Sequence, residues 1–236
     1  MGEPPTVAHD CAIDPGGGDV TGPHQDQPLV TAGAPLDAAE AAVVLVHGRG
    51  ATARSIVHMA DEFHEHGVAF LAPQAAHNTW YPNSFVAPVE RNEPGRSSGL
   101  QAIRDAVEKV SDVGISTERV MLLGFSQGAC LASEFVARNP RRYGGLAVLS
   151  GGLIGPDVDP AEYDGSVDGT PVFLGCDDED PHIPLERVRE TTAAFERLDA
   201  DVTERIYGTL GHGINDDEID HVSEMVRGLL ETPSTG

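Results

Sequence analysis

The chain has 236 residues, enough for one large α/β domain, and 40% of them are hydrophobic and can form a core. Its formal net charge is −23, because 38 acidic residues outnumber 15 lysines and arginines, and Lys109 is the only lysine. Such a surface repels nucleic acids and anionic membranes. We therefore expect no nucleic-acid partner and no stable membrane association.

The cysteines and the N-terminus indicate a cytoplasmic location. Cys11, Cys130 and Cys176 are odd in number and lack metal-ligand spacing, so we expect neither a disulfide framework nor a metal site. No apolar run reaches the length of a membrane span, and the N-terminus lacks the pattern of a secretory signal. The acidity and the near absence of lysine also suggest a halophilic source, which unfolding measurements with and without molar salt would test.

Residues 1–27 are rich in Pro, Gly and Asp and predict a flexible tail, followed by a single domain over residues 28–233. In the domain, short apolar runs alternate with helical patterns. The predicted strands are residues 41–48, 68–73, 119–124, 145–150, 170–175 and 201–207. The predicted helices are residues 53–66, about 100–110, 126–138, 185–198 and 217–230. This alternation predicts the α/β class, with a mostly parallel sheet covered by helices on both faces.

The pattern Gly-Phe-Ser-Gln-Gly at residues 124–128 lies where a predicted strand meets a predicted helix. A serine between two glycines at such a turn is typical of a nucleophile elbow. The helix N-terminus beside it presents free backbone N–H groups to developing negative charge. The alternative is that Ser126 only caps the helix, a position that favours serine. The pattern and its context together favour a nucleophile.

A serine nucleophile needs a base, and His212 is the histidine with the best position. It follows the predicted strand 201–207 and lies between two glycines, as expected for the chain order serine, acid, histidine. The alternative is an exposed loop histidine. A solvated helix face, rather than zinc, explains the histidines at positions 58, 64 and 66.

The acid should follow the predicted strand 170–175, where the sequence places Asp177, Asp178, Glu179 and Asp180. A buried carboxylate hydrogen-bonded to the histidine would fix its tautomer and stabilise the imidazolium. Composition alone does not choose among these four residues, and an acidic surface run is the alternative for all of them.

Two backbone N–H groups are the expected oxyanion donors: that of Gln127, directly after the serine, and that of Arg49 in the segment His-Gly-Arg-Gly at residues 47–50. The alternative for this segment is a tight turn that needs glycine. A nucleotide-binding loop is not favoured, because position 53 is Ala53 where a dinucleotide fingerprint has glycine, and no P-loop lysine follows.

Four segments in order, LVHGRGA, GFSQGACLA, DPHIP and GHGI, resemble the α/β-hydrolase family of carboxylesterases, lysophospholipases and acyl-protein thioesterases. The resemblance covers roughly residues 28–230. It implies an α/β-hydrolase fold, Ser126 as nucleophile, His212 as base, and oxyanion donors at Arg49 and Gln127. It selects Asp180 as the acid because DPHIP follows the family pattern Asp-Pro-x-Val-Pro. The family usually has fewer residues between the strand end and the acid, so Asp177 and Asp178 stay as alternatives.

The loop over residues 78–95 differs from that of the eukaryotic thioesterases and is similar to prokaryotic members, which argues against long-chain acyl-protein substrates. Its aromatic residues Trp80, Tyr81 and Phe85 are predicted to line the substrate pocket, with a loop fastened by its aromatics as the alternative. Cys130 is interpreted as core packing.

These residues predict a serine carboxylesterase that hydrolyses short-chain acyl esters without metal or organic cofactor. The alternatives are a thioesterase or lysophospholipase with the same triad, a dienelactone-type hydrolase, which usually carries a cysteine nucleophile, and a non-catalytic binding protein. We expect a small ester or thioester as the partner and a monomer or homodimer.

Overall fold

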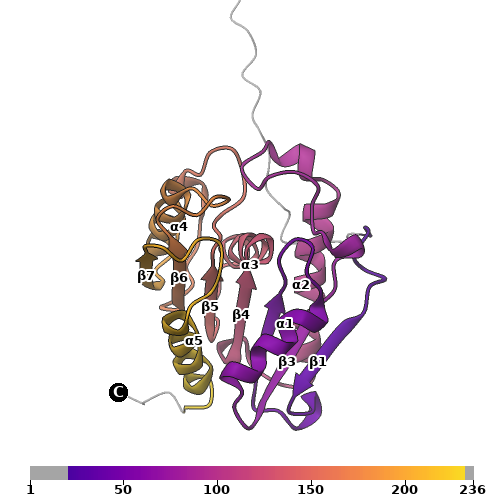
Figure 1. Ribbon diagram of the computed structural model, residues 1–236. Coiled ribbons are helices and arrows are strands. Elements are labelled where there is room, and N and C mark those ends of the chain that lie inside the picture. Colours follow the sequence, from indigo (N-terminus) through magenta and orange to yellow (C-terminus); the bar gives the residue numbers. More distant parts are fainter. Residues whose placement is uncertain (1–20, 232–236) are drawn as a thin grey trace, which may run out of the picture.

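In the computed structural model, which describes residues 21–231, seven strands form one sheet in the order β1-β3-β2-β4-β5-β6-β7 (Figure 1). The strands are β1 (Leu29–Gly33), β2 (Ala41–Val46), β3 (Val68–Pro73), β4 (Val120–Phe125), β5 (Gly145–Leu149), β6 (Pro171–Asp177) and β7 (Asp201–Tyr207). Every neighbouring pair is parallel except β1 with β3. The predicted mostly parallel sheet is confirmed.

Five α-helices cover the two faces of this sheet. They are α1 (Ala53–Met59), α2 (Gly95–Asp112), α3 (Gln127–Arg138), α4 (Leu185–Arg197) and α5 (Asp216–Gly228). Figure 1 shows α1 and α5 in front of the sheet and the other three behind it. Successive side chains of a strand point to opposite faces, so each central strand contributes to two separate cores. Leu122 of β4 packs in the core with α2, α3 and α4, whereas Leu123 packs in the core with α1 and α5.

The parallel strands place their carboxyl ends at one edge of the sheet, where ligands bind in open α/β folds. Residues 47–50 follow β2, Ser126 follows β4, and residues 178–184 follow β6. The loop at residues 208–215 follows β7 and leads into α5. All the predicted site residues on these loops therefore start from the same edge.

The first helix is shorter than predicted. α1 ends at Met59, and the rest of the predicted segment 53–66 contains a 3₁₀ turn over Ala60–Phe63. Thr52 fixes the start of α1 through a capping box with Ser55. A 3₁₀ turn at a helix C-terminus is common and still buries Phe63 against the sheet.

The packed part of the chain begins before residue 28, within the segment that the sequence predicts to be a flexible tail. His24 is only 4% exposed. Its Nδ1 accepts from the Ala76 N–H at 3.0 Å, and its Nε2 lies 2.9 Å from the Trp80 carbonyl oxygen. Burial lowers the pKa of His24, which favours the neutral ring that these two bonds require. Residues 1–20 of the predicted tail and the end of the predicted domain lie outside the described residues.

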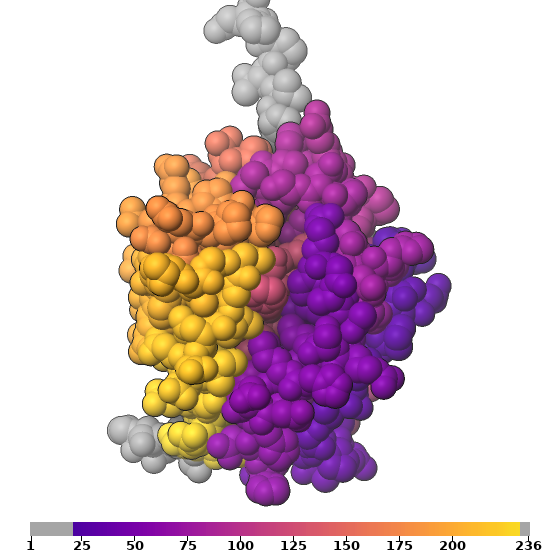
Figure 2. Space-filling view, in the orientation of Figure 1, coloured from indigo at the N-terminus to yellow at the C-terminus, as the bar shows by residue number. Residues whose placement is uncertain are grey.

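Two segments far apart in the sequence lie on the same face. Figure 2 shows α5, in yellow, beside α1, in purple, on the face toward the viewer. Met59 of α1 and Ile214, just before α5, both pack against the core of this face. Within residues 21–231, no helix is both long enough and apolar enough to cross a membrane.

Candidate active site

Ser126 is the single residue between the end of β4 at Phe125 and the start of α3 at Gln127. Its backbone has φ 54° and ψ −120°, a sparsely populated conformation that costs about 1–3 kcal/mol and is typical of functional sites. The strand-to-helix turn is tight, because a Cβ on Gly128 would lie 2.0 Å from the Val46 carbonyl oxygen. The Ser126 side chain makes no capping hydrogen bond to α3, so its hydroxyl is available to other groups.

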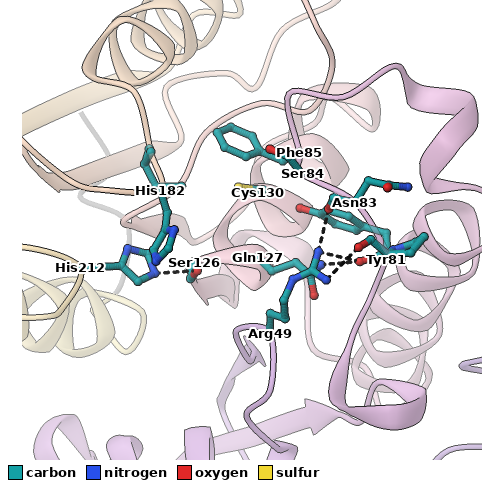
Figure 3. Close-up of a pocket in the computed structure, with 12 residues that line it drawn as sticks. Arg49, Tyr81, Asn83, Ser84, Phe85, Ser126, Gln127, Cys130, His182 and His212 are labelled. Carbon is teal, nitrogen blue, oxygen red and sulfur yellow. Dashed lines mark hydrogen bonds between the residues drawn. The ribbon is translucent and has the colours of Figure 1, made fainter.

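The Ser126 hydroxyl and the Asp180 carboxylate contact opposite nitrogens of the His212 ring. His212 Nε2 lies 2.8 Å from Ser126 Oγ (Figure 3). On the other side of the ring, His212 Nδ1 lies 2.8 Å from Asp180 Oδ2. An ionised carboxylate only accepts hydrogen bonds, so Nδ1 carries the proton of the neutral ring. Nε2 is then free to accept the hydroxyl proton, which is the arrangement of a nucleophile and its base.

Asp180 is the residue of the acidic run that reaches His212. Its side chain is fully buried, whereas Asp178 and Glu179 are exposed. While Oδ2 contacts His212, Oδ1 accepts the backbone N–H groups of His182 and Ile183 at 2.8 and 3.0 Å. These bonds hold the carboxylate in one orientation.

Asp177, an alternative acid in the sequence, supports the loop that carries His212. Its Oδ1 accepts the Glu179 N–H at 2.9 Å, and its Oδ2 accepts the Leu210 N–H. The bond to Glu179 is the main reason that the pKa of Asp177 is lowered. Asp177 therefore binds the backbone two residues before His212 and makes no hydrogen bond to its ring in the described structure.

The two expected oxyanion donors lie on the other side of Ser126 from His212. Within residues 21–231, the backbone N–H groups of Arg49 and Gln127 make no hydrogen bond to a protein acceptor. The neighbouring Gly50 N–H donates to Asn78 O at 2.7 Å, and Gly50 has φ +78°, which only glycine adopts without strain. The turn thus leaves Arg49 with a free backbone donor in the cavity that Ser126 also lines.

The side chains of these same two residues hold the wall of the adjacent cavity. Arg49 donates to the backbone carbonyls of Tyr81, Pro82 and Asn83 at 2.9, 3.0 and 2.7 Å (Figure 3). Gln127 accepts the Trp80 N–H at 2.9 Å and donates to the Tyr81 carbonyl at 2.8 Å. Two residues with free backbone donors therefore also position the loop 80–83.

A cavity of about 430 Å³ opens beside Ser126. It is lined by Arg49, Tyr81, Pro82, Asn83, Ser84, Phe85, Ser126, Gln127, Cys130, His182, Ile183 and His212. Tyr81 and Phe85, for which the sequence predicts a place in the substrate pocket, are among these lining residues. Cys130 is 1% exposed, and burial raises the pKa of its thiol to about 12, so it stays protonated.

Trp80, predicted as a third pocket residue, lies in the core instead. Its side chain is fully buried, and its Nε1 donates to the His47 carbonyl at 2.8 Å. Its ring also packs against the His47 ring, with centroids 5.0 Å apart. A tryptophan side chain is favourably buried where its indole N–H has a hydrogen-bond acceptor. Here that acceptor is the His47 carbonyl, which explains why Trp80 lies in the core and not in the cavity wall.

Glu218 carries a buried carboxyl group in the first turn of α5, directly after the loop that carries His212. Its Oε2 accepts the Asn215 N–H at 2.9 Å in a capping box. Its Oε1 has no hydrogen-bond partner among the described residues, and the side chain is 0% exposed. Burial raises the pKa of Glu218 to about 7.

Glu218→Gln is expected to stabilise the protein increasingly as the pH rises. The unfolded chain ionises this carboxyl near its ordinary pKa of 4.5, whereas the folded chain keeps it protonated up to about 7. The folded state therefore binds more protons between these values, and the free energy of unfolding falls with rising pH. The gap between variant and wild type should widen by up to about 3 kcal/mol from pH 4 to pH 8.

Urea unfolding across this pH range measures the gap. Glu224→Gln is the control, because it removes one carboxyl charge at an exposed position of the same helix. A gap for Glu218→Gln that is constant with pH, like that of the control, would contradict the raised pKa.

The order of the strands and the serine at the turn after β4 define an α/β-hydrolase fold. A model of the phospholipase/carboxylesterase family matches residues 29–230, and the chain belongs to this family. The crystal structure of a phospholipase/carboxylesterase from Dyadobacter fermentans is 39% identical, with a TM-score of 0.81 over 85% of this chain and 96% of that chain. A carboxylesterase from Bacillus cereus shares the fold, with a TM-score of 0.67 at 15% identity.

Curated relatives include an acyl-protein thioesterase 1 from Kluyveromyces lactis, 31% identical over 141 residues. That match covers 58% of this chain and 61% of the thioesterase, so the two are alike over about three fifths of the relative's length. A rice protein described as a probable inactive carboxylesterase is 24% identical over 211 residues. The proteins similar to this chain thus include a thioesterase, a carboxylesterase and a protein described as a probable inactive carboxylesterase.

Proposed function

We propose that the protein is a serine carboxylesterase that hydrolyses short-chain acyl esters through an acyl-enzyme. Ser126 is the nucleophile, His212 the general base and Asp180 the residue that orients His212. The observation that carries this proposal is the pair of 2.8 Å hydrogen bonds that links Ser126 Oγ, the His212 ring and Asp180 Oδ2. Nothing in this reaction requires a metal or organic cofactor.

In acylation, His212 Nε2 takes the proton of Ser126 as Oγ attacks the ester carbonyl carbon. The carbonyl oxygen becomes an oxyanion, which the free N–H groups of Arg49 and Gln127 are positioned to bind. His212 then gives its proton to the leaving alcohol oxygen, and the acyl-enzyme remains. In deacylation a water molecule replaces the alcohol, and His212 acts as base again.

The size of the cavity supports a short acyl group. At about 430 Å³ it lies near the lower end of the range for small-molecule sites. A thioesterase is the second candidate, supported by the relative from Kluyveromyces lactis, because the same groups attack a thioester. Esters and thioesters from acetyl to dodecanoyl distinguish the two, and a maximum at long acyl chains would contradict the short-chain assignment.

A fluorophosphonate probe tests whether Ser126 is an activated nucleophile. We expect stoichiometric labelling, located on Ser126 by mass spectrometry, because a serine beside a base attacks phosphorus much faster than an ordinary hydroxyl does. Ser126→Ala, shown by circular dichroism to be folded, should not be labelled. A folded wild-type protein that resists the probe would favour the non-catalytic alternative, which the rice relative makes worth testing.

A further inference from the structure

His182 is a histidine of the cavity wall that the reaction above does not use. Its ring packs edge-to-face against the His212 ring, with centroids 4.8 Å apart and an interplanar angle of 83° (Figure 3). Its backbone N–H donates to Asp180 Oδ1, and the other oxygen of the same carboxylate contacts His212. One buried carboxylate therefore fixes the two histidines relative to each other.

The His182 ring has unused hydrogen-bonding capacity. In the described part of the chain neither of its ring nitrogens has a hydrogen-bond partner, and the residue is exposed at the cavity. An imidazole carries at least one N–H donor in either protonation state. A group bound in the cavity next to His212 can therefore accept a hydrogen bond from His182 without displacing a protein partner.

His182 lies on the side of Ser126 where the alcohol part of the ester would be bound. His212 delivers its proton to the leaving oxygen, so that oxygen must lie next to His212 Nε2. Figure 3 shows His182 and His212 on one side of Ser126, and Arg49 and Gln127 on the other. Substituents of the alcohol part meet His182, whereas the carbonyl oxygen points to the opposite side.

The charges of the residues that line the cavity determine which substituents on the alcohol part would bind favourably. The titratable side chains that line the cavity include Arg49, His182 and His212. None of the lining residues among positions 21–231 is Asp or Glu, although the protein carries a net charge of −23. The Asp180 carboxylate beneath them is fully buried. Arg49 is held by backbone carbonyls, which satisfy its donors but leave its formal charge uncompensated. Such a wall favours a negatively charged oxygen group over a cationic one.

We propose that His182 is a specificity-determining residue that binds the alcohol part of the ester and favours an alcohol bearing a carboxylate or similar anionic group. This inference rests on the proposed esterase function. It adds a hydrogen-bond donor on the leaving-group side and changes no step of the reaction.

The test uses three nitrophenyl esters with the full-length protein. Two are butyrates that differ only by a carboxylate on the nitrophenyl ring. The third is a monosuccinate, which carries its carboxylate in the acyl part. For wild type, His182→Phe and His182→Gln, the ratio of kcat/KM for the anionic over the neutral butyrate is measured. Both butyrates form the same acyl-enzyme, and kcat/KM covers the steps up to the loss of the alcohol, so this ratio reports binding and acylation and not deacylation.

His182→Phe keeps an aromatic ring beside His212 and removes the donor. We expect it to lower the ratio roughly tenfold, as for the loss of one hydrogen bond to a charged group. His182→Gln, which retains an N–H donor, should restore part of the ratio. His58→Phe, at an exposed histidine on α1, is the matched control and should keep the wild-type ratio.

Three results would overturn the inference while leaving the esterase proposal intact. One is an equal ratio in wild type and His182→Phe. The second is an equal loss with His58→Phe. The third is a decrease confined to the monosuccinate, which would assign His182 to the acyl part. If the wild type hydrolyses none of the esters and resists the fluorophosphonate probe, the proposed function itself fails.

Discussion

In the proposed triad, Asp180→Asn is expected to lower kcat for p-nitrophenyl butyrate by about 10⁴-fold, the effect that the same change has in an established Ser-His-Asp triad. An amide presents an N–H to His212 Nδ1 and stabilises the tautomer with its proton on Nε2. That ring cannot accept the Ser126 proton. The buried Asp180 also loses the charge that stabilises the imidazolium, so the variant is impaired in both acylation and deacylation.

Asp177→Asn is the matched control for this experiment, because Asp177 belongs to the same acidic run and contacts the same loop after β7. Asp177 binds backbone N–H groups of Glu179 and Leu210 rather than the His212 ring. We expect Asp177→Asn to lower kcat by less than tenfold. Its main effect should be a lower unfolding midpoint, because an amide replaces a buried carboxylate whose two oxygens both accept backbone hydrogen bonds. If Asp177→Asn loses 10⁴-fold and Asp180→Asn does not, the acid has been assigned wrongly.

Gly128→Ala is expected to destabilise the protein by about 4 kcal/mol or more, or to prevent soluble folding. Its Cβ would lie 2.0 Å from the Val46 carbonyl oxygen and 2.6 Å from the His47 carbonyl oxygen. Both are backbone atoms at the end of β2 and cannot rotate away as a side chain can. To make room, α3 must move away from the sheet, or the chain leading to Arg49 must shift.

Gly228→Ala provides the control, because it also replaces a helical glycine with alanine. Gly228 is exposed at the end of α5, and no heavy atom lies within 4 Å of a Cβ built there. Alanine favours helix over glycine, so this variant should be unchanged or more stable by up to about 1 kcal/mol. Urea unfolding of both variants measures the difference. A Gly128→Ala protein within 1 kcal/mol of wild type would show that the close approach of α3 to β2 is not required.

The central part of the fold could be predicted because its signals are local. β2, β4 and β5 are short apolar runs followed by turns, and strands buried on both faces have that pattern. β1 is different. It lies at the edge of the sheet, only partly buried, and pairs antiparallel with β3 some forty residues later, so its own sequence carries a weak signal.

The chain order of the candidate site residues could be predicted from the sequence, whereas the acidic residue that contacts His212 could not be chosen from composition. The chain order of Ser126, the acidic run and His212 follows from the strands that precede them. Selecting Asp180 from four acids needed the family resemblance, because burial of one carboxylate is set by how the loop folds and not by composition.

The burial of Trp80 and His24 depends on contacts between distant segments. His24 contacts residues 74 and 56 positions away, at Ser98 and Trp80, and no pattern in the first 27 residues indicates them. The signal for His182 was present in the segment DPHIP, where a histidine takes the variable position two residues after Asp180. Its proximity to His212 becomes clear only from the ring geometry.

The way that Arg49 and Gln127 hold the loop 80–83 bears on how the proposed esterase could be re-engineered. Substitutions of Tyr81, Pro82 or Asn83 that admit larger acyl groups would also disturb Arg49 and Gln127, the proposed oxyanion donors, so we expect such variants to have a lower kcat. Phe85 can be substituted with less effect on these two residues, because its carbonyl accepts the Gly155 N–H at 2.8 Å rather than a hydrogen bond from Arg49 or Gln127. A library of substitutions intended to widen the accepted substrates should therefore begin at Phe85.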